Sequence, residues 1–174
     1  MPRAGAPTLR RAAPLARIAW LARWAGAAAR DAVVQRYARD LERGAEGRGD
    51  LERAAHVLGA FQRRVRFVLD ASDARGFDTY QTARETIERG AGDCDDAAPL
   101  LAAVFGALGL RARLVGMRSP RQAAHSPYPR HVTTQVWAGG RWLYAEPTLR
   151  GAQLGEHPYR AAARLRKGRR DLAS

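Results

Sequence analysis

Lysine, cysteine and long apolar runs are all scarce in this sequence of 174 residues. The single cysteine, Cys94, excludes an intramolecular disulfide and a zinc site built from several cysteines of one chain. No apolar run approaches the ~20 residues of a membrane span, so no association with a membrane is expected. Lys167 is the only lysine, and the basic charge of the chain is therefore almost entirely arginine.

The charge of the chain is concentrated at its two ends. The whole sequence has 30 basic and 17 acidic residues and a net charge of +13. Residues 1–43 hold nine arginines and three acids, and residues 159–174 hold six basic residues and one acid. Residues 44–158 hold fifteen basic and thirteen acidic residues, so this middle part is almost neutral. An acidic partner is therefore expected to meet the basic ends, although no nucleic-acid-binding motif supports such a partner.

The distribution of proline, glycine and charged residues along the chain predicts four segments. Residues 1–13 have the composition of a disordered basic N-terminus, and residues 14–49 read as a helical extension with a linker. Residues 50–158 read as the core, and residues 159–174 as a basic C-terminal tail or helix. Arginines interrupt the apolar stretch that an export signal would need at the N-terminus, so a cytoplasmic location is expected.

Hydrophobic periodicity and turn residues predict helices first and an antiparallel meander afterwards. Helices are expected over about 15–43 with a break or kink at Gly26, from Asp50, over 81–89, and after Gly92. Strands are expected over 111–115, 131–138 and 141–146, with loops at 70–80 and 118–130 and an undecided short strand or helix end at 65–69. This order predicts the α+β fold class.

Cys94 lies in the segment Gly92-Asp93-Cys94-Asp95-Asp96, directly before an apolar helical stretch. A lone cysteine is most often a small buried residue, but three aspartates and a glycine turn surround this one. Asp93 is suited to cap the helix, and the helix dipole then favours a thiolate at Cys94. The aspartates oppose this effect by raising the pKa of the thiol, so a reactive thiolate needs a cationic partner such as histidine.

The predicted hairpin offers that histidine. With Gly139 and Gly140 as the turn, Trp137 faces Trp142, and His131 and Glu146 lie on the same sheet face as diagonal neighbours. A carboxylate can accept the imidazole N–H and favour the cationic ring. If the start of the helix packs over that face, Cys94, His131 and Glu146 form a nucleophile, a base and a residue that orients the base.

Two stretches together resemble the transglutaminase-like superfamily of papain-fold cysteine enzymes. They are ETIERGAGDCDDAAPLLAAVFGALGLRARLV and RHVTTQVWAGGRWLYAEPTL, and the resemblance extends over about Leu51–Pro158. It implies a papain-like core in which the nucleophile helix packs on a small antiparallel sheet, here with extra N-terminal helices. It also implies a catalytic triad at Cys94, His131 and Glu146, because these positions match the family's cysteine at the helix start, histidine at a strand start and acidic residue before Pro-Thr. Bacterial and phage-like relatives are mostly assigned as cysteine proteases or amidases, so the resemblance implies such an activity.

The sequence departs from the family pattern at two positions. Glu146 stands where the family usually has aspartate, and its extra methylene demands a different backbone spacing. Pro99 falls inside the nucleophile helix, where proline removes one backbone hydrogen bond. The helix is therefore expected either to kink at Pro99 or to begin its regular part near it.

Further residues are candidates for the oxyanion hole or the cleft. The backbone N–H of Cys94 is the first expected oxyanion donor. Gln81 is a second, because a glutamine upstream of the cysteine serves this role in papain-like enzymes, although an exposed polar residue is the more ordinary reading. Tyr80 and Asp93 are cleft candidates. Trp137 and Trp142 either pair as packing across the hairpin or wall the cleft.

These residues predict a cysteine hydrolase that acts on a peptide, protein or amide substrate through a thioester. Acyl transfer to an amine needs the same triad. A hypothesis of another class is a non-catalytic binding module whose basic ends contact nucleic acid or another acidic partner. No cofactor and no metal is expected, because the carboxylates and histidines lack a known metal-binding spacing.

Overall fold

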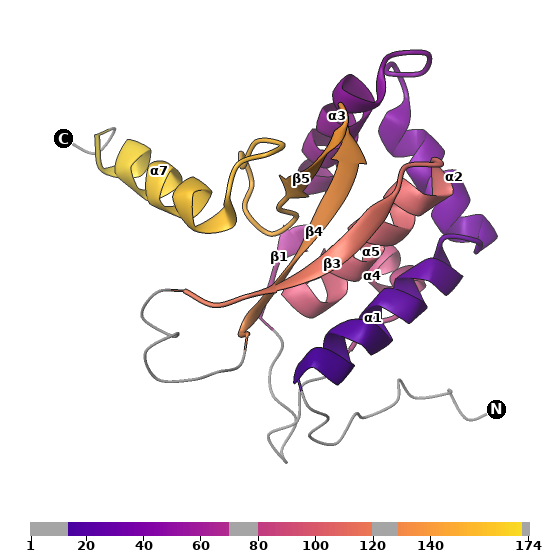
Figure 1. Ribbon diagram of the computed structural model, residues 1–174, viewed down its shortest axis with the longest axis horizontal. Coiled ribbons are helices and arrows are strands. Elements are labelled where there is room, and N and C mark those ends of the chain that lie inside the picture. The colour runs from indigo at the N-terminus through magenta and orange to yellow at the C-terminus, as the bar shows by residue number, and fades with distance from the viewer. Residues whose placement is uncertain (1–13, 70–79, 120–128, 172–174) are drawn as a thin grey trace.

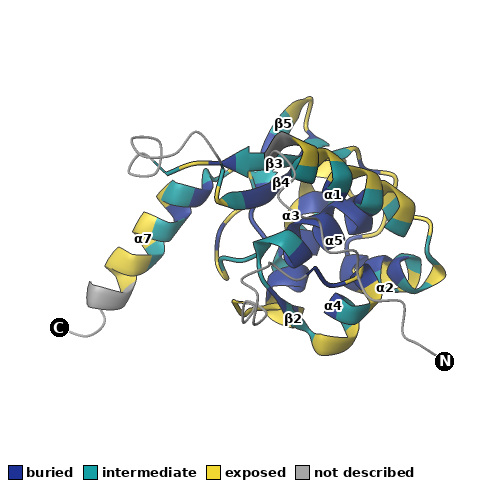
Figure 2. Ribbon diagram, turned by 90° about the horizontal axis from the view of Figure 1, so that it is seen from below, coloured by how far each residue is buried: buried dark blue, intermediate teal, exposed yellow. Residues whose placement is uncertain are grey.

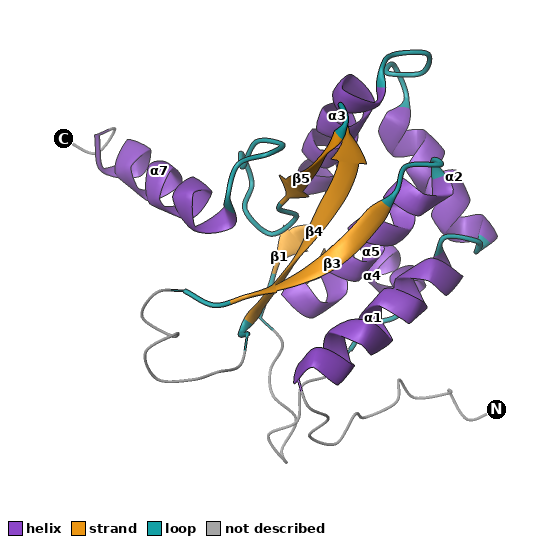
Figure 3. Cartoon of the chain, viewed as in Figure 1, coloured by secondary structure: helices purple, strands orange, loops and turns teal. Residues whose placement is uncertain are grey.

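The computed structural model describes residues 14–69, 80–119 and 129–171 (Figure 1). The predicted disordered segment 1–13 and most of the predicted loops at 70–80 and 118–130 lie outside these ranges. The described helices are α1 (Pro14–Ala28), α2 (Ala32–Glu42), α3 (Asp50–Arg64), α4 (Ala83–Arg89), α5 (Cys94–Ala107) and α7 (Pro158–Asp171). The described strands are β1 (Arg66–Phe67), β2 (Ala91–Gly92), β3 (Ala112–Met117), β4 (His131–Ala138) and β5 (Arg141–Ala145). The predicted α+β class is therefore confirmed (Figure 3).

The antiparallel sheet has the order β3-β4-β5, with β4 in the middle. Gly139 and Gly140 form the β4–β5 turn with φ angles of +58° and +76°, which glycine adopts without steric cost. The predicted hairpin register is confirmed, because Trp137 pairs with Trp142 and Ala138 with Arg141. This register places His131 at the start of β4 and Glu146 directly after β5, at the end of the hairpin opposite the turn.

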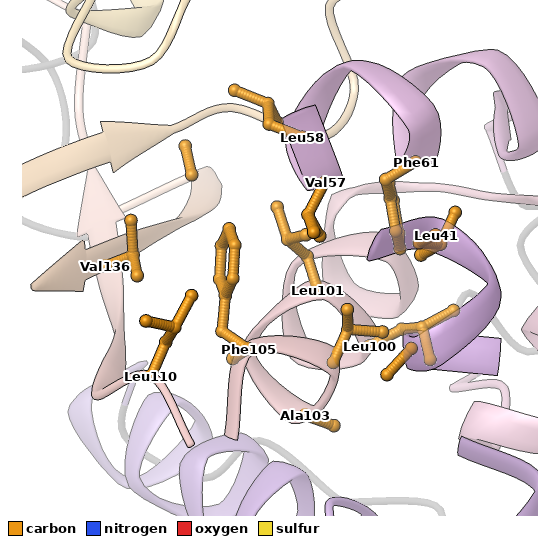
Figure 4. Packing of buried hydrophobic residues seen from close by; sticks show 14 of the residues in the cluster. Leu41, Val57, Leu58, Phe61, Leu100, Leu101, Ala103, Phe105, Leu110 and Val136 are labelled. Carbon is orange, nitrogen blue, oxygen red and sulfur yellow. The ribbon is translucent and has the colours of Figure 1, made fainter. Parts of the chain in front are cut away.

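Helix α5 is the central element of the core, and it packs on the antiparallel sheet as predicted. It packs against β3 and β4, while α1, α2 and α4 also contact it. Its residues from Asp96 to Phe105 are all buried, and apolar ones such as Leu101 and Phe105 belong to the hydrophobic cluster that Figure 4 shows. The Thr134 hydroxyl of β4 donates a 2.8 Å hydrogen bond to the Ala98 carbonyl, which ties the helix to the sheet.

Helices α1 and α2 share this hydrophobic core. Leu21 of α1 and Val34, Ala38 and Leu41 of α2 are buried. The segment predicted as an N-terminal extension thus packs on the same α5 helix as the rest of the fold. The break between α1 and α2 lies at residues 29–31 rather than at Gly26, because the Asp31 side chain accepts from the Val33 N–H and caps α2.

A two-stranded parallel pair joins the end of α3 to the start of α5. Arg66 of β1 pairs with Ala91 of β2, and Phe67 pairs with Gly92. Within the undecided segment 65–69, residues 66–67 therefore form a short strand. This pairing draws the exposed side chains of Phe67 and Leu69 to the region in front of Cys94, where both line the same cavity.

Helix α7 forms the predicted basic C-terminal segment. Its first turns contact the body of the protein, where Pro158 and Ala161 are buried, and residues 166–168 further along the helix are exposed (Figure 2). Arg164 donates to Glu156 and to the Gly151 carbonyl, which fastens the helix to the preceding loop. None of the helices in the described ranges combines the length and apolar composition that a bilayer crossing requires.

Candidate active site

Cys94 is the first residue of α5, and a capping box forms the turn that presents it. The Asp93 side chain accepts from the Asp95 N–H at 2.8 Å, and the Asp96 side chain accepts from the Asp93 N–H. A side chain at Gly92 would collide with Asp96, since a Cβ there would lie 2.7 Å from the Asp96 Cβ. Gly92, Asp93 and Asp96 are thus required by the turn itself.

Helix α5 runs without interruption from Cys94 to Ala107, with Pro99 inside it. The expectation that the regular helix begins near Pro99 is therefore wrong. A proline at this position removes only the hydrogen bond that its own N–H would donate to the Asp95 carbonyl. The first turn keeps its orientation because the capping box holds it independently of that bond.

The Cys94 thiol is half-buried and surrounded mainly by groups that oppose its ionisation. Burial raises the pKa of Cys94, and the negative charges of Asp95 and Asp93 raise it further. The thiol lies 3.6 Å from Asp95 Oδ1, to which it donates. The backbone N–H of Val132 acts in the opposite direction and stabilises the sulfur in its ionised form. In this arrangement the resting sulfur is a neutral thiol.

Arg17 of α1 balances part of the acidic charge next to Cys94. Its Nη2 lies 2.7 Å from Asp95 Oδ2, and its guanidinium also stacks 5.4 Å from the centre of the Tyr80 ring. Both Arg17 and Asp95 line the same cavity as Cys94. The N-terminal helix thus contributes a charged group to the candidate site.

His131 and Glu146 are in direct contact. His131 Nε2 lies 2.8 Å from Glu146 Oε2, which leaves Nδ1 as the ring nitrogen available to another group. Glu146 is completely buried. Its other carboxylate oxygen accepts from the Thr148 hydroxyl at 2.6 Å and from the Thr148 N–H at 2.9 Å. Both carboxylate oxygens are therefore used, and the side chain has a defined orientation.

The buried Glu146 carboxylate is stabilised in its charged form. Burial alone raises the pKa of Glu146, but the hydrogen bond and charge of His131 and the two bonds from Thr148 lower it below its ordinary value. The backbone around it is also held, because Gln62 of α3 donates to the Glu146 carbonyl at 2.9 Å. Gln62 also binds the loop at Gly151 and Ala152.

One cavity of about 800 Å³ contains Cys94 and His131 on its walls. Its charged lining also includes Arg17, Asp95 and Arg130. Its apolar lining comes from separate elements and includes Ile18 and Leu21 of α1, Phe67 and Leu69, Pro129, and Leu149. Ser119 and Pro129, at the two ends of the predicted proline-rich loop, both lie on the cavity wall. A thiol and an imidazole therefore share a mostly apolar cavity that is large enough for part of a peptide.

The other candidates from the sequence lie away from this cavity, with one exception. Gln81 is buried, and its amide donates to Asp96 Oδ2 at 2.8 Å, so it supports the helix cap. Tyr80 is buried against Trp20. Trp137 and Trp142 pair edge to face at 5.5 Å near the hairpin turn. Asp93 alone of the five lines the cavity.

Tyr159 is a residue of the site that the sequence analysis did not identify. It lies in the first turn of α7 and lines the cavity, and its buried hydroxyl has no hydrogen-bond partner among the described residues. Burial raises the pKa of Tyr159, and the charges of Glu146 and Cys94 add to this effect. The hydroxyl therefore stays protonated near the triad candidates. No sequence pattern indicates that Tyr159 lies at the cavity, because its position depends on how α7 packs against the rest of the protein.

Asp93, Cys94 and Asp95 form the cluster of potential metal ligands within the described residues, with ligand atoms within 4.8 Å of one another. Their hydrogen bonds serve other partners: Asp93 caps α5, and Asp95 binds Arg17 and the thiol. The cluster is therefore accounted for by the helix cap and the ion pair.

Comparison with known proteins agrees with this architecture. Similar solved structures are a candidate cysteine protease from Cytophaga hutchinsonii (20% identity, TM-score 0.51) and a candidate protease from Parabacteroides distasonis (12% identity, TM-score 0.57). They cover 71% and 76% of this chain, which in turn covers only 40% and 26% of theirs. No curated protein matches the sequence. The sequence model of the transglutaminase-like superfamily matches residues 35–147, and the chain therefore belongs to that superfamily.

Proposed function

We propose that this protein is a cysteine hydrolase that cleaves a peptide or amide bond through Cys94, His131 and Glu146. The observation that carries the proposal is the 2.8 Å contact between His131 Nε2 and the buried Glu146 carboxylate, at the wall of a cavity that also contains Cys94. This contact orients the ring. An imidazole held in this way is suited to act as a base for the thiol.

The raised pKa of Cys94 indicates how the thiol would be activated. His131 takes the proton while the sulfur attacks the carbonyl carbon, so that no thiolate has to exist beforehand. The C–N bond then breaks, and the leaving amine takes the proton from the imidazolium. Water, activated by the neutral His131, hydrolyses the thioester, and the carboxylic acid product leaves the thiol in its starting form.

Two groups are candidates for stabilising the oxyanion. The backbone N–H of Cys94 lies in the first turn of α5, where N–H groups have no partner within the helix. The hydroxyl of Tyr159 is the second candidate, because it is protonated and unpaired among the described residues. Replacing Tyr159 with phenylalanine removes an unpaired buried hydroxyl, so stability should be kept while turnover falls about tenfold or more. Unchanged turnover would remove Tyr159 from the mechanism.

Activity-based labelling tests the proposal. Iodoacetamide and an epoxide or vinyl-sulfone peptide library should label Cys94, and the Cys94→Ala protein should not react. His131→Ala should slow labelling of the thiol sharply, because the base is lost. Equal labelling rates in the wild type and His131→Ala would overturn the triad. Incorporation of dansyl-cadaverine into a glutamine-containing peptide would instead identify acyl transfer to an amine.

The raised pKa of Cys94 also favours the second candidate function, a non-catalytic module of the same fold. In such a module the cysteine is a structural thiol that donates to Asp95. Labelling that depends on His131 excludes this candidate, because a structural thiol gains nothing from a base beside it.

A further inference from the structure

A second cavity of about 620 Å³ adjoins the first one. It lies between the end of α3, the loop after β5 and the inner face of α7. The two cavities share the residues Phe67, Thr148, Leu149 and Ala162 as a common wall. Thr148 is also the residue that binds the Glu146 carboxylate, so this wall lies directly next to the proposed triad.

Four arginines line the second cavity: Arg63 of α3, Arg66 of β1, Arg150 and Arg166 of α7. Among the residues that the structure describes, no carboxylate lines it. All four side chains are exposed, and within the described ranges none of them takes part in an ion pair or a hydrogen bond with a carboxylate. Some other arginines in the described ranges do form ion pairs, as Arg164 does with Glu156 at 2.7 Å. Four unpaired guanidinium groups around one concavity create a positive potential that favours an anionic occupant.

The remaining lining suits a peptide. Val65, Pro147, Leu149 and Leu165 give the cavity an apolar base onto which the methylene groups of acidic side chains can pack. Guanidinium groups bind carboxylates with two parallel hydrogen bonds, which gives geometric selectivity as well as charge. A nucleic-acid duplex is too wide for a cavity of this size, and the thiol next to it has no reaction with a phosphodiester.

We propose that the second cavity binds an acidic segment of the peptide substrate, adjacent to the bond that Cys94 cleaves. This inference rests on the proposed hydrolase function and assigns it a substrate class. An extended chain that reaches Cys94 from the shared wall passes Arg63, Arg66, Arg150 and Arg166 with its neighbouring residues. Of these four arginines, only Arg166 belongs to the basic ends of the chain, so this site is distinct from the acidic contacts expected at those ends.

Binding to the Cys94→Ala protein tests the inference independently of catalysis. The probe is a fluorescein-labelled hexaglutamate peptide, compared by fluorescence anisotropy with a hexaglutamine peptide of equal length. Hexaglutamate should bind about tenfold more tightly or better, and its affinity should fall as salt is added, because charged contacts are screened. Equal affinity for the two peptides would overturn the inference.

A matched pair of double variants separates this site from the general positive charge. Arg63→Gln/Arg66→Gln should weaken hexaglutamate binding by about fivefold or more, because it removes two guanidinium groups from the cavity. Arg36→Gln/Arg39→Gln also removes two positive charges three positions apart in the sequence, but from the exposed face of α2. This variant should weaken hexaglutamate binding less than about twofold. Equal loss in both variants would overturn the inference. Thermal unfolding checks that each variant folds, and Arg150→Gln/Arg166→Gln replaces the first pair if it does not.

Three further outcomes have definite meanings. Tighter binding of a single-stranded oligothymidylate that is lost in Arg63→Gln/Arg66→Gln would overturn the peptide assignment in favour of nucleic acid. Wild-type cleavage of neutral and acidic peptides at equal rates would support the hydrolase and overturn the acidic preference. Hexaglutamate binding through the arginines without any cleavage would overturn the hydrolase and support the acidic site.

Discussion

Burial, and next to it the carboxylate of Asp95, raise the pKa of the Cys94 thiol. The Asp95 carboxylate also accepts a hydrogen bond from that thiol. Asp95→Asn keeps the shape of the side chain and removes the charge, so the pKa of Cys94 should fall. Each unit by which the pKa falls increases the thiolate fraction at neutral pH about tenfold. The iodoacetamide labelling rate should therefore rise several-fold, and an unchanged or lower rate would contradict this account.

Thr148 tests the environment of Glu146. Thr148→Val keeps the shape of the side chain but removes the 2.6 Å hydrogen bond to the carboxylate, so the pKa of Glu146 should rise. A hydrogen bond to a charged group contributes about 1.5–3 kcal/mol, which sets the expected loss in the free energy of unfolding at neutral pH.

The pH dependence of that loss follows from the direction of the pKa shift. The folded pKa of Glu146 is lowered, so its contribution to stability is present above the unfolded pKa of about 4.3 and is lost as the pH falls through the folded value. Urea unfolding should therefore show the largest difference between wild type and Thr148→Val near neutral pH. The difference should shrink in acid, and a difference independent of pH would exclude this origin.

At the residue level, the sequence predicted those contacts that depend on residues close together in the chain. The contact between His131 and Glu146 follows from the glycine turn, since the hairpin register sets both positions. The roles of Gln81, Arg17 and Tyr159 depend on segments that are distant in sequence. The Gln81 amide meets Asp96, while Arg17 and Tyr159 come to the cavity from the first and last helices. Spacing within one segment cannot reveal such contacts.

At the level of elements, the start of α5 depends on Asp96. This buried side chain accepts from the Gln81 N–H and the Gln81 amide, both at 2.8 Å, and completes the capping box. Asp96→Ala leaves two buried donors unpaired, so it should reduce the free energy of unfolding by about 2–4 kcal/mol. It should also alter the labelling rate of Cys94, which the cap positions.

The capping box of α4 provides the matched control. Glu85 occupies the same position in that box, but its hydrogen bonds to Thr82 are exposed. Glu85→Ala should therefore cost about 1 kcal/mol or less and leave Cys94 labelling unchanged. If chemical denaturation shows equal losses in the free energy of unfolding for the two variants, the contacts of Asp96 with Gln81 add nothing to stability beyond an ordinary helix cap.

At the scale of the whole molecule, α1 belongs to the hydrophobic core. Leu21 is 2% exposed, whereas Leu51 at the start of α3 is 46% exposed. Leu21→Ala should lower the free energy of unfolding by about 2–4 kcal/mol, because it removes a large buried side chain. Leu51→Ala makes the same chemical change at an exposed site and should cost well under about 1 kcal/mol. Similar small effects for both would mean that α1 is a loosely attached extension.

The overall arrangement was less accessible from the sequence than its parts. The helix–sheet order and the β4–β5 register are as predicted, because turn glycines and periodicity are local signals. The helical break was misplaced by three residues because the Asp31 cap outweighs the flexibility of Gly26. The parallel pairing of β1 with β2 joins residues 66–67 to 91–92, and two-residue strands carry no periodic signal.

Hydrogen exchange at the short parallel pairing of β1 with β2 should show whether a ligand fills either cavity. The Arg66 N–H donates to the Gly90 carbonyl at 2.9 Å, and the Val68 N–H donates to the Gly92 carbonyl at 3.1 Å. Phe67, between these two amides, is 49% exposed and lies in the wall shared by both cavities. So short a ladder opens locally with ease, and a ligand packed on Phe67 binds only the closed form. Slower deuterium uptake at these two amides would therefore show that either cavity is filled, without any label on the protein.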